Sequence, residues 1–257
     1  MLFAIKALLI VLITLVTGIL VLSLAPFDRD GRLAYRFSRF WTWAILKIGG
    51  VRLRIQGLEL LDPKRQYVFI ANHQSNIDMP VLVQSLVQFQ LRWVAKKELL
   101  RIPLFGWALR ASRHIIVDRS DRSKAMASLR QAREILKRGL SVVFFPEGTR
   151  SPGGELLPFK RGGFVLALKT RTPIVPVTIK GSRSVLPKGD WRVRAGEIVV
   201  IVSQPIPLDQ PHAGTLGRLV SHVREVIEAH ARQNGGASPK APKPEPARPS
   251  SEGLEKR

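Results

Sequence analysis

The sequence of 257 residues contains no cysteine and few acidic residues. Without cysteine the chain forms no disulfide, no thiolate metal site and no catalytic thiol. The 19 acidic residues stand against 41 lysines and arginines, which gives a net charge of +22. An excess of this size points to one of three partners: nucleic acid, an anionic membrane surface or a phosphorylated substrate. With 45% hydrophobic residues the chain is long and apolar enough to build a packed core.

The sequence also lacks the short motifs that mark several common active sites. It contains no G-x-G-x-x-G or G-x-x-x-x-G-K-[ST] phosphate loop, no H-E-x-x-H zinc motif and no G-x-S-x-G nucleophile elbow. The five histidines are not spaced as metal ligands. We therefore expect no metal site, and the usual signals for dinucleotides and nucleotides are missing.

One charge-free segment near the start has the length of a membrane anchor. As a helix, residues 7–27 would extend over about 31 Å, close to the hydrocarbon thickness of a bilayer. A signal peptide is the alternative, because Ser23-Leu24-Ala25 fits a small-x-small cleavage site. The apolar run is longer than that of a signal peptide, however, and Pro26 would hinder cleavage. The pattern therefore favours a membrane-anchoring helix.

Basic residues follow the anchor and continue through the middle of the chain. Residues 1–27 carry a charge of +1 and residues 234–257 carry +2, so +19 lies on residues 28–233. Four arginines follow the anchor closely whereas only Lys6 precedes it, which places the C-terminal side in the cytoplasm. The aromatic and basic pattern of residues 33–48 fits an interfacial helix and equally well an amphipathic helix of the core.

Beyond residue 50, short apolar runs alternate with helical patterns. This alternation predicts an α/β fold with a mostly parallel central sheet flanked by helices, behind an N-terminal membrane-anchoring helical segment. The expected strands are 51–56, 67–71, 91–95, 114–117, 141–145, 174–179 and 197–202, and the expected helices are 78–88, 122–138 and 214–232. The predicted regions are an anchor and interfacial helix (1–48), a folded domain (49–233) and a disordered Pro-rich tail (234–257).

A run of polar residues separates the expected strand 67–71 from the expected helix 78–88. It contains His73 and Asp78, joined by a turn short enough to bring the carboxylate back to the imidazole. A histidine can take a proton from a hydroxyl, and a carboxylate on its other ring nitrogen would fix its tautomer. The alternative is structural, because Ser75 and Asp78 also fit a capping box at the start of a helix.

A second polar block, Glu147-Gly148-Thr149-Arg150, follows the expected strand 141–145. Glycine lets a backbone approach a ligand closely, and the arginine fork suits phosphate oxygens. The alternative is a plain turn in which Arg150 pairs with Glu147. The block therefore indicates either a phosphate site or an ordinary surface turn.

A third strand end carries Asp118 and Arg119. In isolation a surface ion pair between these two residues is the simpler interpretation. A fourth block, VPVTIKGS at residues 175–182, is typical of a buried strand followed by a turn. Its apolar members are better interpreted as core than as site.

Taken in order, the blocks NHQSNID, IIVDR, FPEGTRS and VPVTIKGS resemble those of the 1-acylglycerol-3-phosphate acyltransferases, also called lysophosphatidic acid acyltransferases. The resemblance spans residues 50–205, and the runs AKKEL and PFKRGGF fit it as well. Residues 49–233 would then be the acyltransferase domain. The third block departs from the family, which often has glycine and phenylalanine where this chain has Arg113 and Ile116. That departure leaves open the local backbone shape and the choice of acceptor.

The resemblance implies transfer of an acyl chain from acyl-CoA or acyl carrier protein to the sn-2 hydroxyl of lysophosphatidic acid, giving phosphatidic acid. It implies no metal and no other cofactor. His73 would be the general base and Asp78 its partner. The residues implied for substrate binding are Arg119, Glu147, Gly148, Thr149 and Arg150 at the acceptor phosphate, supported by Lys97 and Lys160.

The implied partners are membrane lipids, lysophosphatidic acid and the acyl donor, with no nucleic acid. The implied localisation is the inner membrane of a bacterium, with the catalytic domain on its cytoplasmic face. An acyltransferase for another lysolipid or glycerolipid is the alternative of the same chemistry. A membrane-tethered nucleic-acid-binding protein is suggested by charge alone and lacks a recognised motif. A non-catalytic lipid-binding scaffold is disfavoured by the presence of both His73 and Asp78. The lack of cysteine favours direct transfer, and Ser75 as a nucleophile stays open.

Overall fold

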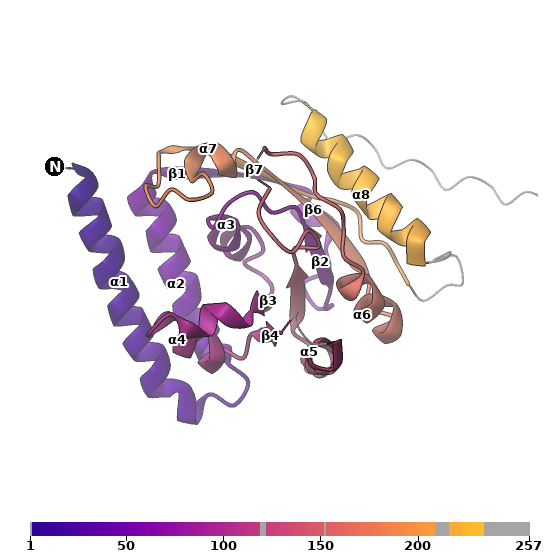
Figure 1. The fold of residues 1–257 in the computed structure, drawn as a ribbon, viewed down its shortest axis with the longest axis horizontal. Coiled ribbons are helices and arrows are strands. Elements are labelled where there is room, and N and C mark those ends of the chain that lie inside the picture. The colour runs from indigo at the N-terminus through magenta and orange to yellow at the C-terminus, as the bar shows by residue number, and fades with distance from the viewer. Residues whose placement is uncertain (1, 119–121, 152, 209–215, 234–257) are drawn as a thin grey trace, which may run out of the picture.

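The computed structural model describes residues 2–118, 122–151, 153–208 and 216–233. A seven-stranded sheet in the order β1-β7-β6-β2-β5-β3-β4 forms its centre (Figure 1). The strands are β1 (Val51–Gln56), β2 (Val68–Ala71), β3 (Leu91–Lys96), β4 (Ile115–Val117), β5 (Ser141–Phe144), β6 (Ile174–Lys180) and β7 (Gly196–Val202). Each predicted strand is present, and its bounds differ from the prediction by at most one residue at either end.

The sheet is mostly parallel, as predicted. The five strands from β6 to β4 all run in one direction, whereas β7 pairs antiparallel with β6 and parallel with β1. Only the β1–β7 edge therefore runs the opposite way. Because five neighbouring strands are parallel, their carboxyl ends meet at one edge of the sheet, where α/β proteins commonly build their sites.

Helices cover both faces of this sheet (Figure 1). The helices are α1 (Leu2–Leu24), α2 (Arg32–Gly49), α3 (Asp78–Ser85), α4 (Phe105–Ala111), α5 (Arg122–Lys137), α6 (Gly162–Thr170), α7 (Ser182–Val185) and α8 (Leu216–Arg232). One hydrophobic cluster joins the sheet to α2 and α3, and a second joins it to α5, α6 and α8. The three helices predicted in the folded domain are confirmed, and the prediction missed α4, α6 and the four-residue α7.

Helix α1 is long and apolar enough to cross a membrane, by length and composition. The segment Phe3–Phe27 has a hydropathy of 2.9, and most of its large side chains are exposed. The helix packs along α2 and against α4, and the indole of Trp41 donates to the Thr14 hydroxyl at 2.9 Å. This packing supports a helix that is retained in the folded protein over a cleaved signal peptide.

Helix α2 has a buried face and an exposed aromatic face. The side chains of Tyr35 and Leu46 belong to the core, and the helix packs on α3. On the other side Phe40 and Trp43 are about half exposed and stack on each other, with ring centroids 5.9 Å apart. The amphipathic core helix is thus confirmed, while the interfacial role of residues 33–48 stays a prediction.

A buried arginine ties the turn between α1 and α2 to the sheet. The guanidinium of Arg92, on β3, donates to the carbonyls of Asp30 at 2.8 Å and Gly31 at 3.0 Å. Burial lowers the pKa of Arg92 to about 10, so the side chain is still cationic at neutral pH. The Asp28 carboxylate accepts two backbone N–H groups of the first turn of α2, at 2.8 and 2.7 Å. The helical hairpin therefore has a fixed place against the sheet.

The boundaries 1–48, 49–233 and 234–257 stay a prediction. The hairpin shares side chains with the core of the folded domain, so no gap in packing separates the first two regions. The predicted disordered tail lies outside the described residues.

Candidate active site

The structure brings His73 and Asp78 together at the carboxyl edge of the sheet. Strand β2 ends at Ala71, the chain turns, and α3 begins at Asp78. The imidazole Nδ1 lies 2.8 Å from Asp78 Oδ2. The carboxylate is fully buried whereas the imidazole side chain is 18% exposed. No hydrogen bond to a described residue engages Nε2, so this nitrogen is the one that can meet a substrate.

Backbone groups of the same turn hold the Asp78 carboxylate. Its Oδ2 also accepts the N–H groups of Gln74 and Ser75, each at 2.8 Å. Hydrogen bonds to an ionised acceptor are short and fix its orientation. Half of the predicted capping box is formed, because Asp78 accepts the Ser75 N–H, whereas the Ser75 hydroxyl donates to the Leu186 carbonyl at 2.6 Å and accepts the Ile77 N–H at 3.2 Å. Asp78 thus serves the imidazole and its own turn at once.

Two aromatic rings set the plane of the His73 imidazole. The ring stacks on Phe145 with centroids 4.0 Å apart, and Phe145 stacks in turn on Trp93 at 6.0 Å. The stack follows from the strand order, because β2, β5 and β3 are adjacent and parallel. The ring therefore has one defined orientation with its edge directed by Asp78.

The carboxylate of Glu147 points into the protein, where it binds backbone N–H groups. Its Oε1 accepts the His73 N–H at 2.7 Å and its Oε2 accepts the Leu157 N–H at 3.0 Å. Burial raises the pKa of Glu147 above its ordinary value, and the two N–H donors oppose that rise. The predicted alternative, a turn with Arg150 paired to Glu147, is not observed, since Arg150 forms no ion pair with any described residue.

The rest of this block folds back toward the histidine. Gly148 has φ +73°, a left-handed conformation that glycine adopts without strain, and its N–H donates to the Phe145 carbonyl. Thr149 is exposed and Arg150 is partly buried. The N–H of the following residue, Ser151, donates to the His73 carbonyl at 2.9 Å. The turn therefore places Arg150 one residue away from a direct contact with His73.

The two predicted lysines lie on separate segments of the same edge. Lys97 follows β3 and pairs with Asp118 at 2.8 Å, across the neighbouring strand β4. Lys160 is exposed, and its N–H donates to the Pro146 carbonyl. Arg119 lies outside the described residues, and with it the predicted alternative of a surface pair to Asp118.

The sequence left open the backbone shape at Arg113, where the third block departs from the family. Arg113 has φ +57°, in the left-handed region that favours glycine. The resemblance places glycine at this position in related proteins. The chain thus keeps the backbone shape of a glycine position while carrying an arginine, at a cost of about 1 kcal/mol or more.

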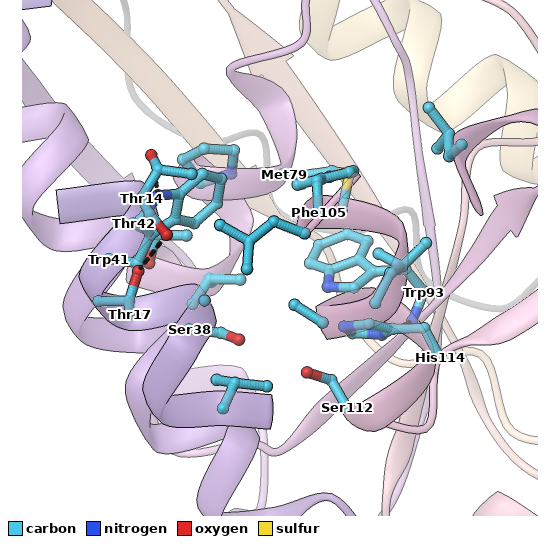
Figure 2. A pocket seen from close by; sticks show the side chains of 18 of the residues that line it. Thr14, Thr17, Ser38, Trp41, Thr42, Met79, Trp93, Phe105, Ser112 and His114 are labelled. Atoms are coloured by element: carbon cyan, nitrogen blue, oxygen red, sulfur yellow. Dashed lines mark hydrogen bonds between the residues drawn. The ribbon is translucent and has the colours of Figure 1, made fainter. Parts of the chain in front are cut away.

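A largely apolar cavity of about 410 Å³ lies between the hairpin and the sheet (Figure 2). Its walls come from α1, α2, α3, α4 and β3 and from the segments that connect them, and sequence patterns gave no sign of it because so many separate parts of the chain form it. Met79, next to Asp78, and Trp93, at the end of the ring stack that begins at His73, both line it. His114 also lines it and accepts the Trp93 N–H, and burial lowers the His114 pKa to about 3, which keeps that ring neutral.

Residues 52–180 match the sequence model of the family described as Acyltransferase. The matched region holds strands β2 to β6 and both members of the His73–Asp78 pair. The protein is therefore an acyltransferase. More narrowly, the chain belongs to the 1-acyl-sn-glycerol-3-phosphate acyltransferase family.

Two curated relatives and one solved structure support this family assignment. The 1-acyl-sn-glycerol-3-phosphate acyltransferase of Limnanthes douglasii is 36% identical over 87% of this chain and 78% of its own length. The enzyme of that name from Pseudomonas aeruginosa is 37% identical over 66% of this chain and 67% of its own. The crystal structure of the 1-acyl-sn-glycerophosphate (LPA) acyltransferase PlsC from Thermotoga maritima superposes with a TM-score of 0.68 at 28% identity, covering 89% of this chain and 99% of that one. The predicted α/β fold is confirmed.

Proposed function

We propose that this protein transfers an acyl chain from an acyl thioester to the sn-2 hydroxyl of 1-acylglycerol-3-phosphate, giving phosphatidic acid. The single observation that carries the proposal is the His73–Asp78 pair at the sheet edge, with Nδ1 held by a buried carboxylate and Nε2 hydrogen-bonded to none of the described residues. The names of the curated relatives support the choice of acceptor.

In the proposed step, Nε2 of His73 takes the proton of the sn-2 hydroxyl as its oxygen attacks the thioester carbonyl. A C–O bond forms, the C–S bond breaks, and the proton passes from the imidazole to the leaving thiolate. Asp78 stabilises the imidazolium between these events, because its Oδ2 accepts the Nδ1 hydrogen.

Ser75 is poorly placed to be a covalent nucleophile. It is fully buried, and its hydroxyl already donates to the Leu186 carbonyl and accepts the Ile77 N–H. A hydroxyl used in this way has no free proton to give to a base. This supports direct transfer from thioester to acceptor.

For the acceptor phosphate we propose the turn Gly148-Thr149-Arg150, with Arg119, Lys97 and Lys160 supporting substrate binding. Glu147 belongs to the same block, but its carboxylate is occupied by two backbone N–H groups. We therefore propose that Glu147 acts as a positioning residue that ties the His73 backbone to this phosphate turn. The turn itself supplies the guanidinium of Arg150, which forms no ion pair with a described residue.

The cavity between the hairpin and the sheet is the proposed place for an acyl chain (Figure 2). Its volume of about 410 Å³ lies within the ordinary range for ligand pockets, roughly 300–1,000 Å³. Apolar side chains from α1 to α4 line most of it, and its wall at Trp93 and Met79 adjoins the catalytic pair. An acyl chain seated there would have its carboxyl end near His73.

The protein associates with a membrane, and α1 supplies the exposed apolar surface for it. We propose that the catalytic domain lies on the cytoplasmic side of a bacterial inner membrane, because its excess of basic residues suits the anionic surface of the cytoplasmic leaflet. We propose acyl-CoA or acyl carrier protein as donor, lysophosphatidic acid as acceptor, and no metal or other cofactor.

Thiol release from an acyl thioester tests the proposed function. The full chain in membranes is given acyl-CoA or acyl carrier protein, with lysophosphatidic acid, glycerol-3-phosphate or another lysolipid as acceptor. We expect thiol release that depends on lysophosphatidic acid, with phosphatidic acid as the product. Equal release with every acceptor would contradict the choice of substrate, and DNA binding without any release would favour the nucleic-acid alternative.

Replacing Arg150 should weaken acceptor binding more than turnover. We expect Arg150→Ala to raise the KM for lysophosphatidic acid by about 10- to 100-fold, because a hydrogen bond to a charged group contributes about 1.5–3 kcal/mol. The KM for the acyl donor should change little. Steady-state kinetics with each substrate varied separately measure this, with the exposed Arg133→Ala on α5 as the matched control. An unchanged acceptor KM would place the phosphate elsewhere.

A further inference from the structure

The loop between α7 and β7 (Figure 1), residues 186–195, has no part in the proposed reaction, yet it contacts both the helical hairpin and the active-site turns. Val193 anchors it to the hydrophobic core and packs over Gly49, where an added Cβ would lie 2.6 Å from the valine side chain. Arg192 and Arg194, on either side of Val193, are exposed. The loop is therefore fixed at its base and presents its other side chains outward.

Trp191 is the most exposed tryptophan of the described residues, with 68% of its surface accessible. It contacts Phe3 edge to face, with ring centroids 4.7 Å apart and an interplanar angle of 68°. Phe3 begins the exposed apolar side of α1, which continues along the helix to Leu20. The indole thus extends the apolar surface of α1 onto the catalytic domain. Tryptophan at the border of an apolar surface is typical of a membrane–water interface.

The outward charge of this loop is basic. Its single carboxylate, Asp190, accepts the N–H groups of Trp191 at 2.8 Å and Arg192 at 3.0 Å, and binds the Arg194 guanidinium at 2.8 Å. The Asp190 side chain is only 13% exposed, whereas the two arginines are 61% and 54% exposed. Arg192 Nε also lies 3.3 Å from Asp190, so both arginines cover this carboxylate. With Lys188 the loop keeps a net charge of +2, which complements an anionic surface.

Hydrogen bonds connect the same loop to the candidate active site. The Leu186 carbonyl accepts the Ser75 hydroxyl at 2.6 Å, within the turn that carries His73 and Asp78. The Lys188 ammonium donates to the Arg150 carbonyl at 3.2 Å. A surface bound by this loop would thus lie close to the turns that hold the catalytic pair and the proposed phosphate site.

We propose that residues 186–195 form a second membrane-contact element, in which Trp191 enters the headgroup region of an anionic bilayer and Arg192 and Arg194 contact lipid phosphates. The inference rests on the proposed membrane association through α1 and adds a contact made by the catalytic domain itself. It takes α1 to lie within the near leaflet and not across the bilayer, because the start of the helix contacts Trp191 and its later turns pack on α4. With two separate contacts the domain has a fixed orientation. In that orientation the two loops that carry His73 and Arg150 face the leaflet that contains the acceptor.

A single introduced cysteine tests this contact, because the chain has none of its own. Trp191→Cys carries an apolar fluorophore such as acrylodan, and Gln131→Cys on the exposed side of α5 is the matched control. On vesicles containing phosphatidylglycerol we expect a blue shift and a several-fold loss of acrylamide quenching at residue 191. The control label should not change. Sedimentation of the vesicles shows how much protein is bound.

The proposal fails if vesicle-bound protein has a label at residue 191 that acrylamide quenches as it does in detergent. That result would leave α1 as a membrane contact and would not touch the thiol-release test, so the two proposals fail separately. Shielding of residue 191 by acyl carrier protein but not by vesicles would also overturn the membrane assignment in favour of a protein partner.

A second variant removes the basic side chains and keeps the indole. Arg192→Gln with Arg194→Gln should lower turnover several-fold when lysophosphatidic acid is presented in anionic vesicles. Turnover of a short-chain acceptor dissolved as monomers should be unchanged. An equal loss with both acceptors would mean that the two arginines support the fold or the active site, and would overturn their assignment as lipid contacts.

Discussion

His73→Ala should lower acceptor-dependent thiol release by about 10²- to 10⁴-fold, the range that a positioned general base contributes. In the structure Nδ1 of the histidine lies on a buried carboxylate, Nε2 bonds to none of the residues that the structure describes, and the ring stacks on Phe145. Alanine removes the proton acceptor, and among the described residues no other imidazole lies in this turn. Single-turnover measurement of thiol release reports the chemical step directly.

The fold and the membrane contact of the His73→Ala protein should survive. The backbone N–H and carbonyl of residue 73, which bond Glu147 and Ser151, are kept by alanine. Thermal unfolding and vesicle sedimentation check both properties. His222→Ala, at an exposed position of α8, is the matched control and should keep full activity. Turnover near that of the unchanged protein in His73→Ala would refute the base assignment.

Regular structure was largely predictable because local apolar patterns report it. All seven strands follow short apolar runs whose ends carry polar or turn residues, and their bounds were accurate to one residue. Helix α6 was missed because it opens with Gly162-Gly163, and glycine is a poor helix former. Helix α4 is only seven residues long, too short for a helical period to be recognised.

Local sequence patterns could not predict which strand ends lie next to one another in the sheet. Two strands distant in sequence, β2 and β5, are adjacent in the sheet, and only this adjacency brings Glu147 to the His73 backbone. The resemblance grouped Glu147 with the phosphate-binding residues. In the structure its carboxylate accepts backbone N–H groups, and contacts of this kind leave no trace in the pattern of side chains. The apolar cavity could not be predicted for the same reason, because its wall is assembled from helices, a strand and connecting segments that are distant in sequence.

Asp78→Asn should lower kcat for acyl transfer by about 10²- to 10⁴-fold with little change in the acceptor KM. The reason is that the carboxylate acts through the histidine and does not contact the substrate. Its Oδ2 accepts three N–H groups, from the imidazole and from the backbone of Gln74 and Ser75. An asparagine amide can accept those bonds with its oxygen but carries no charge to stabilise an imidazolium. The transition state therefore loses stabilisation while the turn keeps most of its hydrogen bonds.

The ratio of the two kinetic effects separates this role from a structural one. Asp62→Asn, in an exposed turn where the carboxylate also accepts a backbone N–H, is the matched control and should leave both constants unchanged. If Asp78 only shaped the turn, Asp78→Asn would disturb the neighbouring phosphate turn and raise the acceptor KM together with the loss in rate. A rate constant within a few-fold of the unchanged protein would show that the imidazole does not need the carboxylate, and would remove Asp78 from the proposed mechanism.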